Sequence, residues 1–256
     1  MSAPTNEKYL GRRKMKKYYF FLGGSDAEMV EIKKILSENN IPFSDKNLGW
    51  GAKASAYAEE IISAKKGKLF PVFVELENDI NYDGTIVDHH GSRAGEQPSI
   101  IQVLNLLGLI KPTRWQKLIG ANDAGYIPAM VAIGATEEEI KKVRLADRTA
   151  QGITPEQERE AERAIAAYEV SGRLTIVHMA HSKCATVTDR LFGKYDQLLI
   201  LSSDGEVNFF GDGALCVELK EKFQGWNGGS GLGKKGENAY WGGYPMIESF
   251  VKQALG

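Results

Sequence analysis

Residues 85–99, Thr-Ile-Val-Asp-His-His-Gly-Ser-Arg-Ala-Gly-Glu-Gln-Pro-Ser, place an aspartate and two adjacent histidines directly after a short apolar run. Because this run is rich in β-branched residues and follows Gly84, it predicts a buried strand. Asp88, His89 and His90 then stand at its carboxyl end, where open α/β sheets carry their ligand sites. The chain has four histidines, so half of them lie in this dipeptide. Such a concentration of titratable groups predicts a functional site.

The two histidines can divide the work of such a site. Neighbouring residues on an extended segment point to opposite sides, so one imidazole can bind a metal ion while the other faces a substrate as a proton donor. Asp88 can ligate the ion or orient an imidazole. The alternative is a polar loop in which both histidines only form caps or hydrogen bonds. Two histidines in succession favour the functional interpretation.

The segments around this stretch predict a parallel sheet. Apolar runs at 18–22, 41–43 and 69–74 indicate further strands, and helices are expected after Ser25-Asp26 and over about 54–64 and 98–108. Strands that alternate with helices favour a parallel sheet with right-handed crossovers. Asp26, Glu75 and Asp88 are therefore expected at one edge of this sheet. Ser25 or Asp26 would also cap the first helix, which is the simpler explanation for both.

Four side chains are candidate metal ligands. Asp123 lies in the small-residue segment 120–125, which is expected to be a loop after an apolar stretch. With Asp26, Glu75 and His89, it gives four potential ligands at four strand ends of one sheet. Three carboxylates and an imidazole are a hard, oxygen-rich set, which suits Mn²⁺ or Mg²⁺ better than structural zinc.

The motif Val87-Asp88-His89-His90-Gly91, followed by Pro98-Ser99-Ile100 and a helix, resembles the DHH phosphoesterase superfamily. That superfamily includes RecJ-type exonucleases and phosphodiesterases of small oligonucleotides and cyclic dinucleotides. The resemblance covers the chain from residue 18 onward. It implies an α/β fold, in which a parallel-sheet N-terminal DHH-type domain is joined by a helical linker to a smaller α/β C-terminal domain.

The resemblance also implies roles for single residues. It implies that one or two Mn²⁺ or Mg²⁺ ions are held by Asp26, Glu75, His89 and Asp123. His90 would face the scissile phosphate, with Asp88 beside it as a ligand or as support. Such an ion polarises a phosphoryl oxygen and lowers the pKa of a bound water. Arg93, in the following loop, is a candidate phosphate clamp or an ordinary surface arginine.

The first acidic loop departs from the family pattern. Family members commonly carry a histidine and two aspartates there, whereas this chain has Gly23, Gly24 and Asp26, with Glu28 as a substitute. Glu75 stands in place of the usual aspartate, with Asp79 as a nearby competitor. These departures predict the loss of one of two metal sites and a weaker hydrolytic activity.

The second half of the chain predicts a connection and a further domain. Charge-rich helices run from Thr136 to about Tyr168, and Thr154-Pro155 predicts a capped helix start. We assign 18–150 to the metal-binding domain, 151–172 to a connecting helix and 173–256 to the C-terminal domain. Strand patterns follow at 174–179, 197–201 and 207–210, and the last two predict a hairpin around Asp204-Gly205.

A glycine run in the C-terminal domain is a candidate phosphate site. Backbone N–H groups of Gly228, Gly229, Ser230 and Gly231, reinforced by Lys234 and Lys235, could form an anion-binding nest. A flexible loop is the alternative. The family's associated C-terminal domain uses a glycine-rich loop with a histidine in this role, and Leu232 stands where that histidine is expected.

His181 is a further candidate substrate contact. It lies near His178 and Cys184 at a strand-to-helix junction, so a Cys/His nucleophile pair is a conceivable alternative. No orienting group or oxyanion site is evident upstream. We therefore prefer the contact role.

Composition narrows the class of partner. Thirty-two basic and thirty-three acidic side chains among 256 residues leave almost no net charge, which disfavours a protein that coats long duplexes. A small phosphorylated or nucleotide substrate, or a short single-stranded nucleic acid, fits better. The basic stretch 12–17 is interpreted as a solvated tail. A homodimer is left open.

Two distant cysteines favour a reducing, cytoplasmic compartment. Neither a signal peptide nor an apolar run of roughly twenty residues is evident, so no membrane partner is expected.

The sequence thus predicts a metal-dependent phosphoesterase, a hydrolase acting as a phosphodiesterase on a small nucleotide, a dinucleotide or a short single-stranded oligonucleotide. The alternative is a catalytically weakened DHH-type regulatory protein that binds nucleotides or proteins. Inorganic pyrophosphatase is a third option, which the terminal glycine run disfavours.

Overall fold

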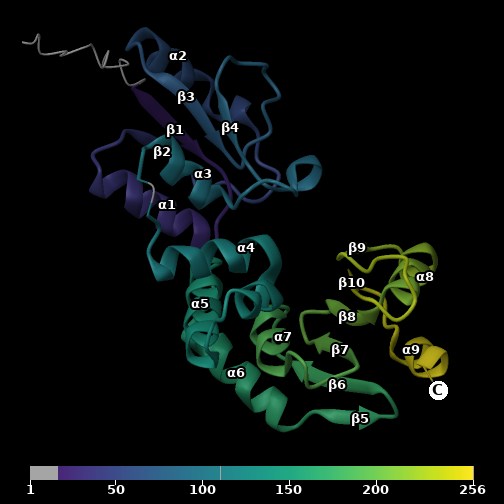
Figure 1. Ribbon diagram of the computed structural model, residues 1–256. Helices are drawn as coiled ribbons and strands as arrows, with labels where there is room; N and C mark the ends of the chain where they lie inside the picture. The colour runs from purple at the N-terminus through teal and green to yellow at the C-terminus, as the bar shows by residue number, and fades with distance from the viewer. Residues whose placement is uncertain (1–16, 110, 256) are drawn as a thin grey trace, which may run out of the picture. The chain divides into compact units, whose positions relative to one another are not determined.

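The computed structural model describes residues 17–109 and 111–255, so residues 12–16 of the basic stretch lie outside the described part. The chain divides into two compact units, Met1–Gln151 and Gly152–Gly256 (Figure 1). Among the described residues, no helix combines the length and the apolar character needed to cross a membrane.

The first unit is built on a four-stranded sheet in the order β2-β1-β3-β4. All neighbouring strands are parallel, as the sequence predicts. The strands are β1 (Tyr18–Leu22), β2 (Phe43–Asp45), β3 (Phe70–Val74) and β4 (Thr85–Val87).

Helices cover both faces of this sheet. Side chains alternate along a strand, so Phe20 and Leu22 of β1 face one core and Phe21 faces the other. The first core is closed by α1 (Ala27–Glu38), α3 (Ser99–Leu106) and α4 (Arg114–Ala132), with α5 (Glu137–Ala150) packed on α1 and α4. The second core is closed by the 3₁₀ helix η1 (Ala54–Tyr57) and by α2 (Ala58–Lys66).

The first unit differs from the sequence prediction around Asp123. Asp123 lies inside α4 and not in a loop, because the capping box of Thr113 and Gln116 starts a helix and Leu118 and Ile119 bury one face of it. The backbone becomes non-helical only at Gly125 and Tyr126. The break precedes Pro128, whose ring and missing N–H disfavour a continuous helix.

The second unit is a six-stranded mixed sheet in the order β5-β6-β7-β8-β10-β9. The strands are β5 (Glu169–Ser171), β6 (Leu174–Met179), β7 (Gln197–Ser202), β8 (Val207–Asp212), β9 (Trp226–Gly228) and β10 (Asn238–Gly243). The hairpin predicted around Asp204-Gly205 is confirmed, since β7 and β8 pair antiparallel and Gly205 has φ +92°. Only glycine adopts such a value without strain.

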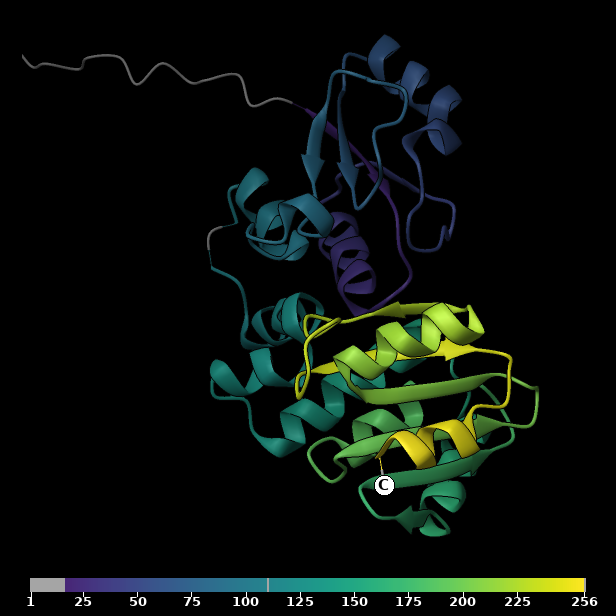
Figure 2. The ribbon, with the colours of Figure 1, turned by 90° about the vertical axis from the view of Figure 1, so that its right-hand side faces the viewer.

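Helices again lie on both faces, as Figure 2 shows. The buried residues of α8 (Gly213–Phe223) and α9 (Glu248–Leu255) join one core, and those of α6 (Pro155–Ala166) and α7 (Ala185–Leu191) join the other. Thr154 caps α6 with proline at its first turn, as expected. The segment predicted as a connecting helix contains α6, and α6 packs on the sheet of the second unit through Ala161 and Ala164.

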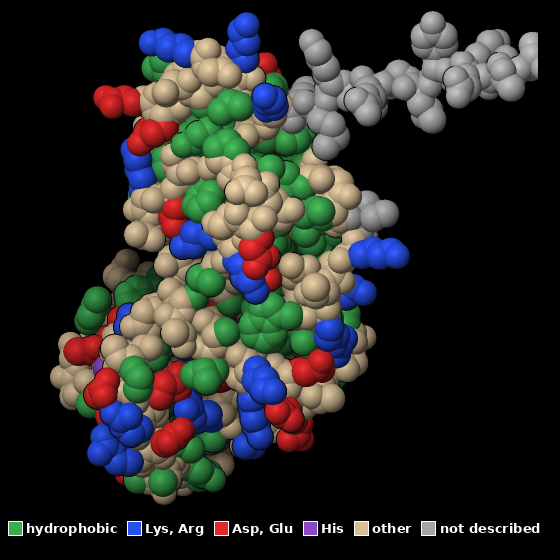
Figure 3. Space-filling model, turned by 90° about the vertical axis from the view of Figure 1, so that its left-hand side faces the viewer, with side chains coloured by type: hydrophobic (Ala, Val, Ile, Leu, Met, Phe, Trp, Pro, Cys, Tyr) green, Lys and Arg blue, Asp and Glu red, His purple; other side chains and the backbone are tan. Residues whose placement is uncertain are grey.

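On the face drawn in Figure 3, acidic and basic side chains are interspersed.

The glycine run folds tightly against the start of α8. Asp212 caps this helix by accepting hydrogen bonds from the backbone of Ala214 and Leu215, and it also accepts one from Gly236 at 2.7 Å. The Gly233 amide donates to the carbonyl of Gly213 at 2.9 Å. The loop is thus a packed element, which disfavours the alternative of a flexible linker.

Gly213→Ala is expected to destabilise the second unit by about 1–3 kcal/mol, because a Cβ at this position would lie 1.8 Å from the Gly231 carbonyl oxygen. Chemical denaturation followed by circular dichroism measures this change. Gly95→Ala is the matched control, since nothing lies within 4 Å of its Cβ position. Equal stability of the two variants would contradict the packed arrangement.

Candidate metal centre

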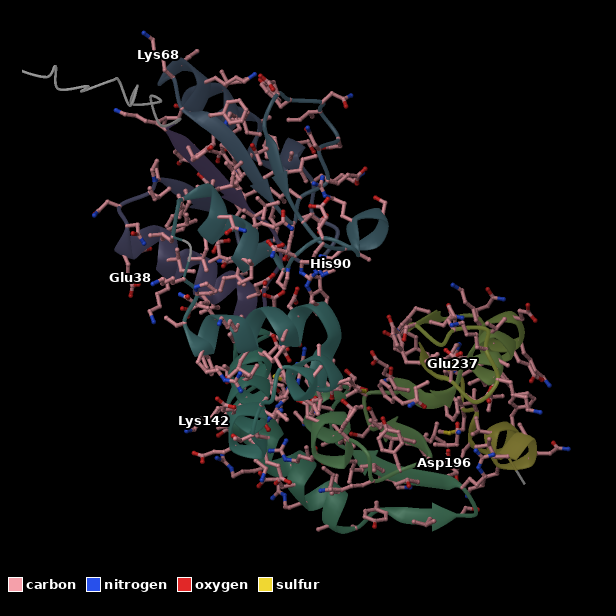
Figure 4. The ribbon with its side chains drawn as sticks, viewed as in Figure 1. Glu38, Lys68, His90, Lys142, Asp196 and Glu237 are labelled. Atoms are coloured by element: carbon pink, nitrogen blue, oxygen red, sulfur yellow. The ribbon has the colours of Figure 1, made fainter. Side chains whose placement is uncertain are left out.

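Four side chains of the first unit converge at the carboxyl edge of its sheet. Glu28, Glu75, His89 and Asp123 each bring one ligand atom into a group whose atoms all lie within 4.8 Å of one another. They come from the first turn of α1, the ends of β3 and β4, and α4. Figure 4 labels the neighbouring His90 at this edge of the sheet.

The backbone delivers Glu75 into this group in a strained conformation. Its φ is +52°, which a residue with a side chain rarely adopts. The loop that follows β1 approaches the Glu75 backbone closely, since a Cβ at Gly23 would lie 2.4 Å from the Glu75 carbonyl oxygen. Strain of this kind typically costs about 1–3 kcal/mol and is concentrated at functional sites.

His89 lies at the centre of the carboxylates. Its Nε2 atom is 2.6 Å from Asp123 Oδ2, 3.4 Å from Glu28 Oε2 and 3.9 Å from Glu75 Oε1. Burial alone would lower the pKa of His89, but hydrogen bonds with Asp123 and Glu28 and the charges of both carboxylates raise it to about 10. Without an ion, the imidazolium is thus the cation of the cluster.

The carboxyl groups respond to the same crowding. Burial, followed by the charges of Asp123, Glu28 and Asp26, raises the pKa of Glu75 to about 10. Burial is also the main reason why the pKa of Glu28 is raised, although its hydrogen bond with His89 acts in the opposite direction. Buried like charges disfavour ionisation of the whole set.

The residues present fit a divalent cation. Both carboxylate oxygens of Glu75 are buried without a hydrogen-bond partner, and the buried Glu28 Oε2 lies 3.4 Å from His89 Nε2. Such atoms are costly in a folded protein unless something pairs with them. Three carboxylates and one imidazole are a suitable donor set for a hard ion such as Mn²⁺ or Mg²⁺.

Glu28 takes a place that the sequence assigned only as a substitute. Its Oε1 accepts a hydrogen bond from the backbone N–H of Ile100 at 3.1 Å, and its Oε2 faces His89. An acid in the first turn of a helix is common for electrostatic reasons, so this position alone does not distinguish a ligand from a residue that only stabilises the helix.

Asp26 stands beside this group of four. Its Oδ1 caps α1 by accepting from the Met29 N–H at 2.9 Å, and its Oδ2 is 3.4 Å from Trp50 Nε1. Burial and then the charge of Asp123 raise the pKa of Asp26. The capping role expected for this residue is confirmed. Asp79, the competitor of Glu75, accepts from the Ser55 backbone at an exposed position.

The extended geometry predicted that the two adjacent histidines point to opposite sides. This prediction is wrong. Their ring centroids are 4.3 Å apart, because the chain turns into the 3₁₀ helix η2 (Gly91–Arg93) directly after His90. They differ instead in exposure: His89 is buried, whereas the His90 side chain is 50% exposed.

Asp88 holds the exposed ring in place. Its Oδ1 accepts from the backbone N–H of His90 at 2.9 Å and from Nδ1 of the same residue at 3.0 Å. The other ring nitrogen, Nε2, lies 3.7 Å from Asp123 Oδ2 and so faces the carboxylates. Glu75, His89 and His90 also form a possible three-ligand group. Arg93 pairs with Glu96 at 3.0 Å.

The predicted binding residues of the second unit are largely engaged within the protein. His181 Nδ1 accepts from the Lys183 N–H, which leaves its Nε2 to donate to the Gln157 carbonyl at 3.0 Å. Backbone amides of the glycine run also donate internally, among them those of Gly231, Leu232, Gly233 and Lys234. The Lys234 side chain pairs with Glu237 at 3.1 Å. Gly228 pairs with Tyr240 in the sheet, and Gly229 has φ +104°.

The Cys/His alternative finds no support in the described residues. Burial, with smaller contributions from Glu206 and Asp204, raises the pKa of the Cys184 thiol to about 12. A nucleophilic cysteine requires the opposite shift.

A buried network behind the cluster was not found from the sequence. Arg144 Nη1 donates to Asn122 Oδ1 at 2.8 Å and to Asp147 Oδ2 at 2.7 Å, and its guanidinium lies 4.6 Å from the centre of the Tyr126 ring. Asp147 Oδ1 in turn accepts from the Ala27 N–H at 3.1 Å. Asn122 and Ala27 each precede a member of the cluster, so this network connects the two segments that carry Asp123 and Glu28.

No protein-family model matches the chain, and no curated protein matches it. Among solved structures, the pGpG-specific phosphodiesterase PggH from Vibrio cholerae is similar over 93% of this chain and 97% of its own, with a TM-score of 0.50 and 12% identity. The chain shares the fold of PggH. An exopolyphosphatase-related protein from Bacteroides fragilis is similar over 94% of this chain and 92% of its own, with a TM-score of 0.44 and 11% identity. The two-domain α/β fold expected from the DHH resemblance is therefore the fold observed.

Binding of Mn²⁺ at this cluster is expected to release about two protons near pH 7, because a metal ligand must be deprotonated while His89 and Glu75 have pKa values of about 10. The affinity should consequently rise with pH up to this range. Titration calorimetry in buffers of different ionisation enthalpy measures the released protons. Binding without proton release would contradict the assigned ligands.

Arg144→Lys is expected to weaken Mn²⁺ binding about tenfold, since a lysine cannot bridge Asn122 and Asp147 as the planar guanidinium does. The dissociation constant can be measured by the same calorimetry, with circular dichroism as a check of folding. Lys142→Met is the matched control on α5, because this lysine is 66% exposed and pairs with Glu138 in a surface contact. Unchanged affinity in Arg144→Lys would exclude a role of the network in positioning the ligands.

Proposed function

We propose that this protein is a DHH-type phosphodiesterase that binds one divalent ion, Mn²⁺ or Mg²⁺, and hydrolyses a small nucleotide, a dinucleotide or a short single-stranded oligonucleotide. The observation that carries the proposal is the group Glu28, Glu75, His89 and Asp123, with its buried and unpaired carboxylate oxygens. The Val-Asp-His-His-Gly motif and the shared fold add support.

A single ion accounts best for the ligands present. The candidate ligand groups both contain Glu75 and His89, so they describe one locus. The two carboxylate oxygens of Asp26 already accept hydrogen bonds, one from the backbone at the start of α1 and one from the indole of Trp50. Gly23 and Gly24 offer no side chain where the family commonly has a histidine.

The bound ion would polarise a phosphoryl oxygen and lower the pKa of a bound water. The protein side chains would position the ion and the substrate and transfer a proton to the leaving oxygen. Glu28, Glu75 and Asp123 provide negative charge in a buried setting, and the helix dipole and fixed hydrogen bonds hold them there. A phosphate anion is thereby bound only together with the cation, because the carboxylates alone would repel it.

His90 is the proposed proton donor to the leaving oxygen. With Nδ1–H given to Asp88, the protonated ring presents its second proton at Nε2, on the side that faces Asp123. As the P–O bond breaks, this proton passes to the departing oxygen. Asp88 stabilises the protonated ring and fixes its orientation. Arg93 remains a proposed phosphate clamp once a ligand competes with Glu96.

The substrate class rests on chemistry and on a comparison of folds. PggH is a phosphodiesterase specific for pGpG, a linear dinucleotide, and it shares this fold. The near-neutral charge of the chain disfavours long polyanions. For the second unit by itself, Gly228, Gly229, Ser230, Gly231, Lys234 and His181 stay proposed contacts to a phosphate group.

The second candidate function is a regulatory protein that binds nucleotides or proteins without turnover. The observation in its favour is the depleted first loop, in which Asp26 caps a helix. Elemental analysis of the purified protein distinguishes the candidates, because one bound Mn²⁺ with turnover supports the enzyme, and no retained metal with intact nucleotide binding supports the regulatory role.

His90→Ala is expected to reduce kcat for Mn²⁺-dependent hydrolysis of a dinucleotide by about 10²–10⁴-fold while Mn²⁺ still binds, since the general acid is lost but the buried ligands remain. Asp123→Asn is expected to reduce metal affinity as well. Steady-state assays over a panel of dinucleotides, with calorimetric Mn²⁺ titration of each variant, measure both effects.

His178→Ala is the matched control, because this histidine is 59% exposed and belongs to the second unit, where it lies 3.9 Å from Glu169. The proposal would be wrong if wild-type protein hydrolyses no dinucleotide in excess Mn²⁺, or if His90→Ala is as active as His178→Ala.

A further inference from the structure

Trp50 is the most exposed large hydrophobic side chain among the described residues, with 70% of its surface accessible. It lies in the loop between β2 and η1. Tryptophan is highly buried on average, so an indole held in solvent requires an explanation. The position next to the candidate metal centre suggests one.

The indole stands at the rim of the carboxylate group. Its Nε1 atom lies 3.4 Å from Asp26 Oδ2. A methyl group added at Gly24 would lie 3.2 Å from Glu75 Oε2 and 3.8 Å from Trp50 Cδ1. The edge of the indole and a proposed metal ligand therefore both lie within 4 Å of the Gly24 Cβ position.

The loop presents the ring without enclosing it. Gly49 and Gly51 flank Trp50, and nothing lies within 4 Å of either Cβ position. Gly51 has φ +74°, which glycine adopts without strain. No packing neighbour therefore accounts for the two glycines, whereas the hydrogen bond with Asp26 fixes the edge of the indole. With 70% of the residue accessible, the indole offers surface to a ligand.

We propose that Trp50 stacks on a nucleobase of the substrate and so selects nucleotides over base-free phosphoesters and polyphosphate. The inference rests on the proposed function. The proposed metal site would bind a phosphate group, and the indole would stack on a flat aromatic group beside it. A nucleotide carries both groups. Stacking of bases on aromatic side chains is strong and tolerant of base identity.

This role also gives a physical reason for the depleted first loop. A bulky side chain at Gly24 would occupy the space between Glu75 and the indole. The glycine keeps this space open for the ligand. Asp26 accepts a hydrogen bond from the indole of Trp50 through its Oδ2 and caps α1 through its Oδ1.

The test compares a dinucleotide with its abasic counterpart, which has the same sugar–phosphate backbone without bases. The ratio of kcat/KM for the two substrates is expected to fall about tenfold or more in Trp50→Ala, mainly through KM, and to recover in part in Trp50→Phe. Tyr168→Ala, which removes an exposed aromatic ring directly before β5, should keep the wild-type ratio. A ratio in Trp50→Ala that equals that of wild type would overturn the proposal, even if both activities fall.

A second measurement separates this inference from the proposed function. Wild-type protein with Mn²⁺ is titrated with a phosphorothioate dinucleotide, and quenching of tryptophan fluorescence is compared with that of Trp50→Phe. Quenching that is present in wild type and lost in Trp50→Phe supports stacking, whether or not any substrate is hydrolysed. Equal quenching in both proteins would refute it. Absence of turnover together with Trp50-dependent quenching would contradict only the phosphodiesterase.

Discussion

Negative charge held out of water at the carboxyl edge of one sheet is the constraint on which the rest of the first unit depends. Glu28, Glu75 and Asp123 surround His89, and both carboxylate oxygens of Glu75 are buried without a hydrogen-bond partner. Charges in such a setting are costly unless they are neutralised. Without a metal ion, protonation of Glu75 and His89 reduces the net negative charge, and the pKa values of both groups are raised accordingly. A bound divalent cation would neutralise more of this charge.

Several features of the fold hold these groups together against their repulsion. The hydrogen bond of Glu28 with the Ile100 N–H joins α1 to α3 beneath the cluster. Arg144 connects the residues that precede Asp123 and Glu28, and the left-handed backbone at Glu75 turns its carboxylate inward. A site that is unfavourable in isolation is thus supported by packing around it, as is usual for preorganised centres.

The same edge separates a buried, charge-holding layer from an exposed, ligand-facing one. His89 belongs to the first layer, whereas His90 and Trp50 belong to the second. Asp88 and Asp26 each fix one of these exposed rings through a carboxylate oxygen. Under the proposed function, this arrangement would place a proton donor and an aromatic ring beside the bound ion.

The sequence by itself determined the parallel sheet, the hairpin at Asp204-Gly205 and the place of the histidine pair, because strand patterns, turn residues and chain order are local properties. It also indicated Glu75, His89 and Asp123 as members of one site. Only the tertiary structure decided that Glu28 and not Asp26 joins them, that Asp123 comes from a helix and that Arg144 lies behind both. These outcomes depend on contacts such as Glu28 with Ile100 and Arg144 with Asn122, between residues far apart in the chain. Local propensity carries no information about such pairings, since burial and competition among nearby charges choose among them.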